Sequence, residues 1–141
     1  MKAYRWFERA LLVILSFGIT AVIAACYGGY YMMQKLAGGK VTSGGAPVKA
    51  VNVCLYANTG GSMSEAGCAY SDETGLYTIE GPDHAQNDIL NNGGKIEVKD
   101  QDGELNGLYG DQTIDIAPQA TPLTIDIELE QVKAEEPASQ S

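Results

Sequence analysis

The sequence predicts a small all-β protein: a seven-stranded antiparallel β-sandwich that follows an N-terminal signal peptide. Two observations predict the sandwich. The chain contains 17 glycines and no sustained helical period, and short apolar runs alternate with turn signals every 8 to 15 residues. A third observation, the charge pattern of the N-terminus, predicts the signal peptide. The folded part has about ninety residues, which is enough for one small core.

The N-terminus has the profile of an export signal. Three basic residues and one acidic residue lie within the first nine positions, and residues 10–25 carry no charge. This uncharged stretch is shorter than the roughly 20 strongly apolar residues that span a bilayer comfortably. We therefore interpret residues 1–25 as a cleaved signal peptide.

A cysteine stands where the signal peptide should be cut. The segment Ile23-Ala24-Ala25-Cys26 resembles the bacterial lipobox, whose cysteine is lipidated and becomes the mature N-terminus. Two or three acyl chains such as palmitate on Cys26 would hold the protein firmly on a membrane. The alternative is that Cys26 is an ordinary small residue of an uncleaved anchor helix.

The residues after Cys26 indicate which membrane would hold the lipid. Tyr27 is not the aspartate that retains lipoproteins in the inner membrane of enteric bacteria. No acidic run of the kind that directs some lipoproteins to the cell surface follows Cys26. We expect attachment to the outer membrane, facing the periplasm.

Cleavage of the signal peptide removes three basic and one acidic residue, so the net charge changes from −9 to −11. Such a chain repels phosphate backbones, and we expect no nucleic-acid binding.

The mature chain divides into three parts. Residues 26–38 mix glycines, aromatics and methionines without a period, and we interpret them as a lipidated tether. Residues 39–132 form the predicted sandwich domain. Residues 133–141 are small and polar and are predicted to be a disordered tail.

Seven segments of the domain have strand character, with period-two patterns such as Ile96/Val98. They span residues 39–48, 48–58, 67–75, 75–81, 94–103, 107–116 and 122–131. Gly44-Gly45 and Asp102-Gly103 supply turn positions with positive φ. The stretch from Gly81 to Gly94 lacks strand character and is predicted to be a loop or to hold one helical turn around Ala85 to Leu90.

The single histidine limits the chemistry that the chain can perform. His84 lies in that polar stretch, where a solvated side chain is the ordinary interpretation. A catalytic triad would have no other histidine as its base, and one chain cannot build a metal site with several imidazoles. We therefore expect a protein that is not an enzyme and needs no cofactor.

Cys54 and Cys68 are the two thiols that remain once Cys26 is lipidated, and an even pair in an exported domain suggests a disulfide. In a hairpin centred on Gly61 they would lie directly opposite each other. Cys54 shares its strand face with Asn52 and Tyr56, the more polar face, which favours an accessible pair. Two alternatives remain: free thiols in the core, or targets of a radical or redox enzyme.

Acidic and amide side chains crowd one predicted turn. Oxygen ligands at alternate positions followed by glycine resemble calcium loops, although the EF-hand pattern is not met. A solvated Asp-Gly turn is the simpler interpretation. The candidate Ca²⁺ ligands are Asp100, Asp102, Glu104, Asn106 and Asp111.

Four tyrosines fall on predicted strands: Tyr56, Tyr70, Tyr77 and Tyr109. They could form a surface on which a sugar or peptide stacks. The ordinary role of a strand tyrosine is mixed burial with the hydroxyl reaching solvent.

The order of these segments resembles a known family. Gly39-Lys40-Val41, Ala46-Pro47-Val48, Val51/Val53 and the hairpin from Ser71 to Tyr77 are similar to the start of carboxypeptidase-regulatory-like domains. Ser71 stands where that family usually has threonine. The resemblance implies a transthyretin-like (prealbumin-like) sandwich.

Residues 10–131 more narrowly resemble lipoproteins encoded beside radical S-adenosylmethionine (radical SAM) enzymes in anaerobic bacteria, and Val98 to Gly107 is the most distinctive match. That family has no established activity. The resemblance implies a lipid-anchored binding or accessory module that is a partner of a radical SAM enzyme or of another envelope protein. The alternatives are a substrate modified by a radical SAM maturase, and an envelope module that binds calcium or sugar.

Overall fold

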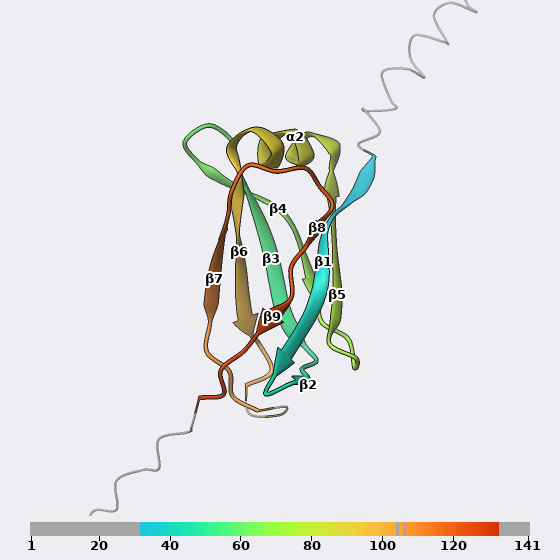
Figure 1. The fold of residues 1–141 in the computed structure, drawn as a ribbon, viewed down its shortest axis with the longest axis vertical. Helices are drawn as coiled ribbons and strands as arrows, with labels where there is room; N and C mark the ends of the chain where they lie inside the picture. Colours follow the sequence, from blue (N-terminus) through green and yellow to red (C-terminus); the bar gives the residue numbers. More distant parts are fainter. Residues whose placement is uncertain (1–31, 104, 106, 133–141) are drawn as a thin grey trace, which may run out of the picture. The chain divides into compact units, whose positions relative to one another are not determined.

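A computed structural model describes residues 32–103, 105 and 107–132. The predicted signal peptide, the lipidation site at Cys26, most of the predicted tether and the predicted C-terminal tail lie outside these residues. More than half of the described residues lie in strands, and Figure 1 shows these strands in two layers with one helix at one end. No helix within the described residues has the length and apolarity needed to cross a membrane.

The first layer is a five-stranded sheet built around β1 (Met33–Ser43). β2 (Ala46–Pro47) and β5 (Leu76–Pro82) pair with β1 in antiparallel fashion. The short strands β8 (Leu123–Thr124) and β9 (Ile127–Glu128) pair with it in parallel.

The second layer is a four-stranded antiparallel sheet in the order β4-β3-β6-β7. Its central strands are β3 (Val51–Asn58) and β6 (Gly94–Asp100). β4 (Met63–Tyr70) and β7 (Gln112–Ile116) form its two edges.

A single hydrophobic core draws side chains from both sheets. Alternate residues of the central strands enter it, as period-two patterning requires. Val51, Val53 and Leu55 are almost fully buried, and so are Ile96 and Val98. The fold is therefore all-β, as the sequence predicts.

Each of the seven predicted segments overlaps a strand, but the described residues form nine strands, of which β8 and β9 are parallel to β1, and not seven antiparallel ones. β4 begins at Met63, four residues before the predicted segment 67–75. The last predicted segment is divided into β8 and β9, and the first into β1 and β2. β1 also begins at Met33, inside the predicted tether of residues 26–38, because Leu36 and Ala37 are fully buried. Gly39 lets the backbone at Ile125 approach β1 closely, because a Cβ added at Gly39 would lie 1.9 Å from the carbonyl oxygen of Ile125.

The stretch predicted to be a loop or one helical turn forms α2 (Asp83–Asn92). It buries Ala85 and Ile89, and Figure 1 shows it across one end of the sheets. Asp83 in the first turn suits the helix dipole. Gly93, with φ of 72°, ends the helix and donates its N–H to the carbonyl of Ile89.

Candidate functional site

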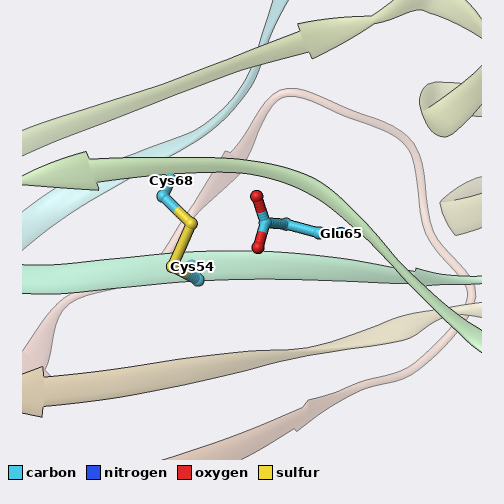
Figure 2. Close-up of side chains that lie close together, drawn as sticks. All are labelled: Cys54, Glu65 and Cys68. Carbon is cyan, nitrogen blue, oxygen red and sulfur yellow. A yellow bond between two sulfur atoms is a disulfide. The ribbon is translucent and has the colours of Figure 1, made fainter.

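A disulfide on the solvent side of the four-stranded sheet is the centre of the candidate site. Cys54 of β3 and Cys68 of β4 are direct cross-strand partners, with Cα atoms 4.1 Å apart, and their sulfur atoms are bonded. Figure 2 shows the bond spanning the two strands. Cys54 is 8% exposed, whereas Cys68 is exposed. The pair is therefore open to solvent on the Cys68 side.

The polar side of this sheet is called the disulfide face below. Its residues alternate along the strands with those of the core. The face comprises Asn52, Cys54, Tyr56, Glu65, Cys68, Tyr70, Lys95, Glu97 and Lys99. The polar face expected from Asn52, Cys54 and Tyr56 is thus the solvent face.

Glu65 reaches the disulfide face because of a β-bulge. The register between β3 and β4 shifts after Leu55, which pairs with Gly67, so that Tyr56 pairs with Glu65. Without the bulge, Ala66 would lie opposite Tyr56 and Glu65 would point inward. Instead Ala66 is buried, and the Glu65 carboxylate lies on the same face as the two cysteines, as Figure 2 shows.

The three side chains converge. One carboxylate oxygen of Glu65 and the sulfur atoms of Cys54 and Cys68 all lie within 4.8 Å of one another. Among the described residues this is the single such group of three or more cysteine, histidine or acidic side chains. Glu65 makes no hydrogen bond or ion pair to any residue that the structure describes.

A second carboxylate flanks the disulfide on the opposite strand. Glu97 of β6 is the cross-strand partner of Cys54. It accepts a hydrogen bond of 2.6 Å from Lys95 and lies 3.5 Å from the Lys99 ammonium. The hydrogen bond from Lys95 is the main cause that lowers the pKa of Glu97. Glu97 is therefore neutralised by lysines, whereas Glu65 is not.

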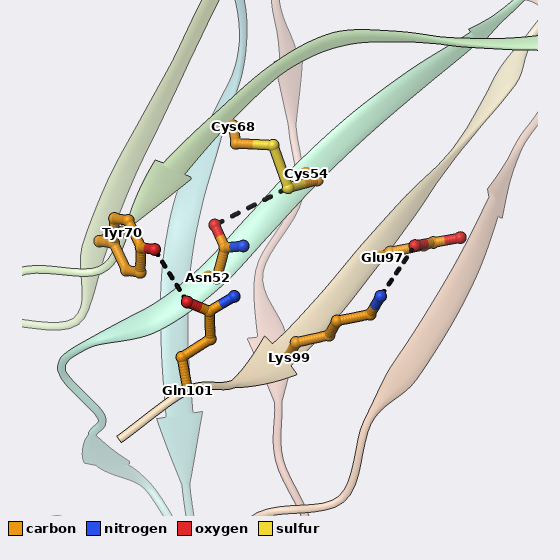
Figure 3. The surroundings of a disulfide bond; sticks show 7 residues. All are labelled: Asn52, Cys54, Cys68, Tyr70, Glu97, Lys99 and Gln101. Atoms are coloured by element: carbon orange, nitrogen blue, oxygen red, sulfur yellow. Dashed lines mark hydrogen bonds and ion pairs between the residues drawn. A yellow bond between two sulfur atoms is a disulfide. The ribbon is translucent and has the colours of Figure 1, made fainter. Parts of the chain in front are cut away.

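Amide and phenol groups surround the disulfide on its other side, as Figure 3 shows. The hydroxyl of Tyr70 donates to Oε1 of Gln101 at 2.9 Å, and Tyr70 is 59% exposed. Asn52 Oδ1 lies 3.7 Å from the Cys54 sulfur. A disulfide sulfur has no hydrogen to donate, so this contact can become an S–H···O hydrogen bond only in the thiol form.

The four strand tyrosines do not share one surface. Tyr56 and Tyr70 belong to the disulfide face, where the Lys95 ammonium lies 5.2 Å from the centre of the Tyr56 ring. Tyr77 is buried in the core and donates to the carbonyl of Ile125 at 2.6 Å. Tyr109 is half-buried. A stacking platform of all four is excluded by these positions, and Tyr70 remains the exposed aromatic.

The predicted calcium ligands fall partly outside the described residues. Glu104 and Asn106 are among the residues not described, and Asp111 is exposed. Asp100 Oδ2 accepts a hydrogen bond from the N–H of Tyr109 at 3.1 Å, while its buried Oδ1 has no partner among the described residues. Burial, followed by the neighbouring Asp102, raises the pKa of Asp100.

His84 lies on α2 and not in a loop. It lines a small pocket of about 30 Å³ together with Glu65, Ser64 and Asp88. That volume is enough for about one water molecule. The pocket adjoins the disulfide face through Glu65 but is too small for an organic ligand.

Sequence reasoning singled out both cysteines of the site but not Glu65. A bulge leaves no signature in the period-two pattern, and in the sequence Glu65 resembles any solvent-exposed strand residue.

The comparison with known proteins adds no further assignment. No protein-family model matches the chain, and no curated protein matches it significantly.

Proposed function

We propose that this protein is a lipid-anchored envelope lipoprotein with a non-catalytic, transthyretin-like sandwich domain. It works by binding, as an accessory module or partner of a radical SAM enzyme system. The signal peptide and lipobox at residues 1–26 carry the proposed anchor. The resemblance of residues 39–77 to carboxypeptidase-regulatory-like domains supports the proposed family of folds, as do two sheets around one core.

The observation that carries the proposal is the disulfide between Cys54 and Cys68. Disulfides form and persist in oxidising compartments and are rare in the bacterial cytosol. A cross-strand disulfide on an exposed face therefore supports export. It agrees with the export signal, which was inferred from a separate part of the sequence.

The disulfide face is the proposed binding surface. It is cross-linked between β3 and β4, and its ion pairs hold the side chains of β6 in place. Tyr70 presents an exposed aromatic ring beside the amide of Gln101. Aromatic and amide groups on a rigid sheet suit recognition of a protein segment, because they combine apolar area with hydrogen bonding.

Intact-mass spectrometry of the protein purified from its own host tests the anchor. The expected species begins at Cys26, carries the mass of a diacylglycerol with or without a further acyl chain, and lacks two hydrogens for the disulfide. The matched variant Cys26→Ser should lose the lipid mass. A native chain that retains residues 1–25 with an unmodified thiol at Cys26 would overturn the proposal.

The same spectra separate the binding role from the alternative of a radical-enzyme substrate. Peptides that contain Cys54, Cys68 or residues 98–111 should have the masses of their unmodified sequences, apart from the disulfide. An added or lost group on one of these peptides in the native host would favour the substrate role instead.

A further inference from the structure

We propose that Cys54, Cys68 and Glu65 form a redox-gated site for a zinc ion, which binds when the disulfide is reduced. The site goes beyond the proposed binding function and does not depend on it. Two thiolates and a carboxylate are ligands that Zn²⁺ accepts, at about 2.3 Å for sulfur and 2.0–2.2 Å for oxygen. Zinc sites with three protein ligands keep a fourth position for water or an outside ligand.

The positions of the three groups support a shared ion. All three ligand atoms already lie within 4.8 Å of one another on one face of the β3–β4 pair, as Figure 2 shows. They come from two hydrogen-bonded strands, so the backbone holds them together whether or not the sulfur atoms are bonded. The remaining adjustment is a change of side-chain rotamers.

The bulge explains why Glu65 belongs to the site. In a regular ladder the position beside Cys68 on this face would be Ala66, which offers no ligand. The register shift replaces it with a carboxylate. Bulges often re-aim a side chain next to a functional site. Glu65 also has no partner within the described residues, so binding a cation costs it no existing ion pair.

The two carboxylates near the disulfide, Glu65 and Glu97, differ in their ion pairs. Glu97 is the cross-strand neighbour of Cys54 on β6, but Lys95 and Lys99 occupy its two oxygens. A cation at Glu97 would have to displace both ammonium groups. Glu65 is thus the carboxylate available to the metal, and Glu97 provides a matched control at the same disulfide.

The gating step is an ordinary thiol–disulfide exchange. A dithiol gives two electrons and two protons to the Cys54–Cys68 bond, which breaks into two thiols, and the dithiol closes into its own disulfide. Zn²⁺ then displaces the two thiol protons into solvent, because the ligands are thiolates. Reoxidation by a disulfide reverses the exchange and releases the ion.

The test uses the full chain in detergent micelles, with Cys26→Ser in every sample so that Cys54 and Cys68 are its only cysteines. Samples are reduced with a phosphine or left oxidised, and are titrated with Zn²⁺ by calorimetry. Co²⁺ serves as a second probe, because thiolate ligation gives a sulfur-to-metal charge-transfer absorption. We expect one ion per reduced chain and none per oxidised chain. Oxidation should release the bound ion.

The variants identify the ligands. Glu65→Gln should weaken zinc binding by about tenfold or more, since even indirect metal contacts contribute that much. Glu97→Gln should change the affinity by less than about threefold. Replacement of both cysteines by serine should abolish the charge-transfer band. Circular dichroism on the same samples checks that each variant remains folded.

Four outcomes would overturn the proposal. They are equal zinc binding by the oxidised and reduced chains, equal binding by the double serine variant, an unchanged affinity in Glu65→Gln, and a reduced chain that unfolds and is not refolded by zinc. None of these depends on whether Cys26 is lipidated, so the site and the proposed anchor fail or stand separately.

Discussion

The phenolic hydroxyl of Tyr77 donates a hydrogen bond of 2.6 Å to the backbone carbonyl of Ile125. This bond links the core face of β5 to the segment between β8 and β9, since Ile125 is 48 residues from Tyr77 along the chain. The C-terminal segment has only two-residue strands, so this side-chain bond is an important part of its attachment.

Tyr77→Phe should lower the free energy of unfolding by about 1 kcal/mol, because it removes one hydrogen bond and leaves the Ile125 carbonyl unsatisfied. The variant keeps the ring and therefore the packing. Urea denaturation followed by circular dichroism measures the change. Tyr70→Phe is the control, since that hydroxyl is on the surface. Equal losses in the two variants would contradict the assignment.

The same residue predicts a dependence on alkaline pH. Burial raises the pKa of Tyr77 to about 12, with a smaller contribution from Asp126. A raised pKa means that the folded state holds the proton more tightly than the unfolded state. The stabilisation is therefore complete below about pH 10 and is lost as the pH rises towards 12. In a plot of melting temperature against pH, Tyr77→Phe should lack the part of the decrease between about pH 10 and 12 that ionisation of Tyr77 causes.

Replacing Cys54 and Cys68 with alanine should cost about 3 kcal/mol of stability, since the bond closes a loop of about 15 residues in the unfolded chain. Urea denaturation in buffer with a metal chelator measures the loss. Reduction of the wild-type disulfide should give a similar loss, and the variant should not respond to the reductant. A loss below about 1 kcal/mol would show that the hairpin holds its register without the bond.

Gly39→Ala should destabilise the protein by about 3 kcal/mol or prevent folding. Its Cβ would lie 1.9 Å from the carbonyl oxygen of Ile125, and backbone cannot move aside as a flexible side chain can. Gly110→Ala is a matched control, because its nearest neighbour would be a Val132 methyl at 3.5 Å. Thermal melts of both variants should separate clearly. A stable Gly39→Ala protein would contradict the close approach of these segments.

Asp100→Asn should stabilise the protein slightly at pH 7, by less than about 1 kcal/mol, because the side chain is only partly buried and solvent screens its charge. Burial, with Asp102 beside it, raises the pKa of Asp100 above its usual 3.8, so the ionised carboxylate disfavours the folded state. This penalty is absent below about pH 3, grows as the pH rises from the usual pKa of 3.8 to the raised folded pKa, and is constant above it. The gain should therefore vanish near pH 3.

Melting temperatures at pH 3 and pH 7, in buffer with a chelator, measure the effect at Asp100. Asp111→Asn is the control, because Asp111 is exposed and its replacement should change little. A gain that is equal at both pH values would show that burial of the charge is not its cause.

Local patterns allowed much of the fold to be predicted from the sequence. Alternation of apolar and polar residues placed Val51, Val53 and Leu55 in the core, and the spacing about Gly61 placed Cys54 opposite Cys68. The turn glycines Gly44 and Gly45 have the expected positive φ. Such features depend on neighbours within one strand or hairpin, and these can be read along the chain.

The start of β1 and the helix α2 were less predictable. Residues 33–38 lie in a stretch without a sustained period, yet they form a strand because they pair with β5 and bury Leu36 and Ala37. α2 has two buried residues and no side-chain cap at its N-terminus, so its local signals are weak. Contacts with distant strands stabilise both elements, and a local pattern does not contain those contacts.

The sequence by itself determined the strand-rich body, the single histidine and the pair of cysteines, because composition and short-range periodicity encode these features. Only the tertiary structure decided that Glu65 lies beside the disulfide, that lysines neutralise Glu97, and that Tyr77 is buried while Tyr70 is exposed. The physical reason is register: a shift of one residue reverses the face of a side chain, and pairing between strands sets that shift.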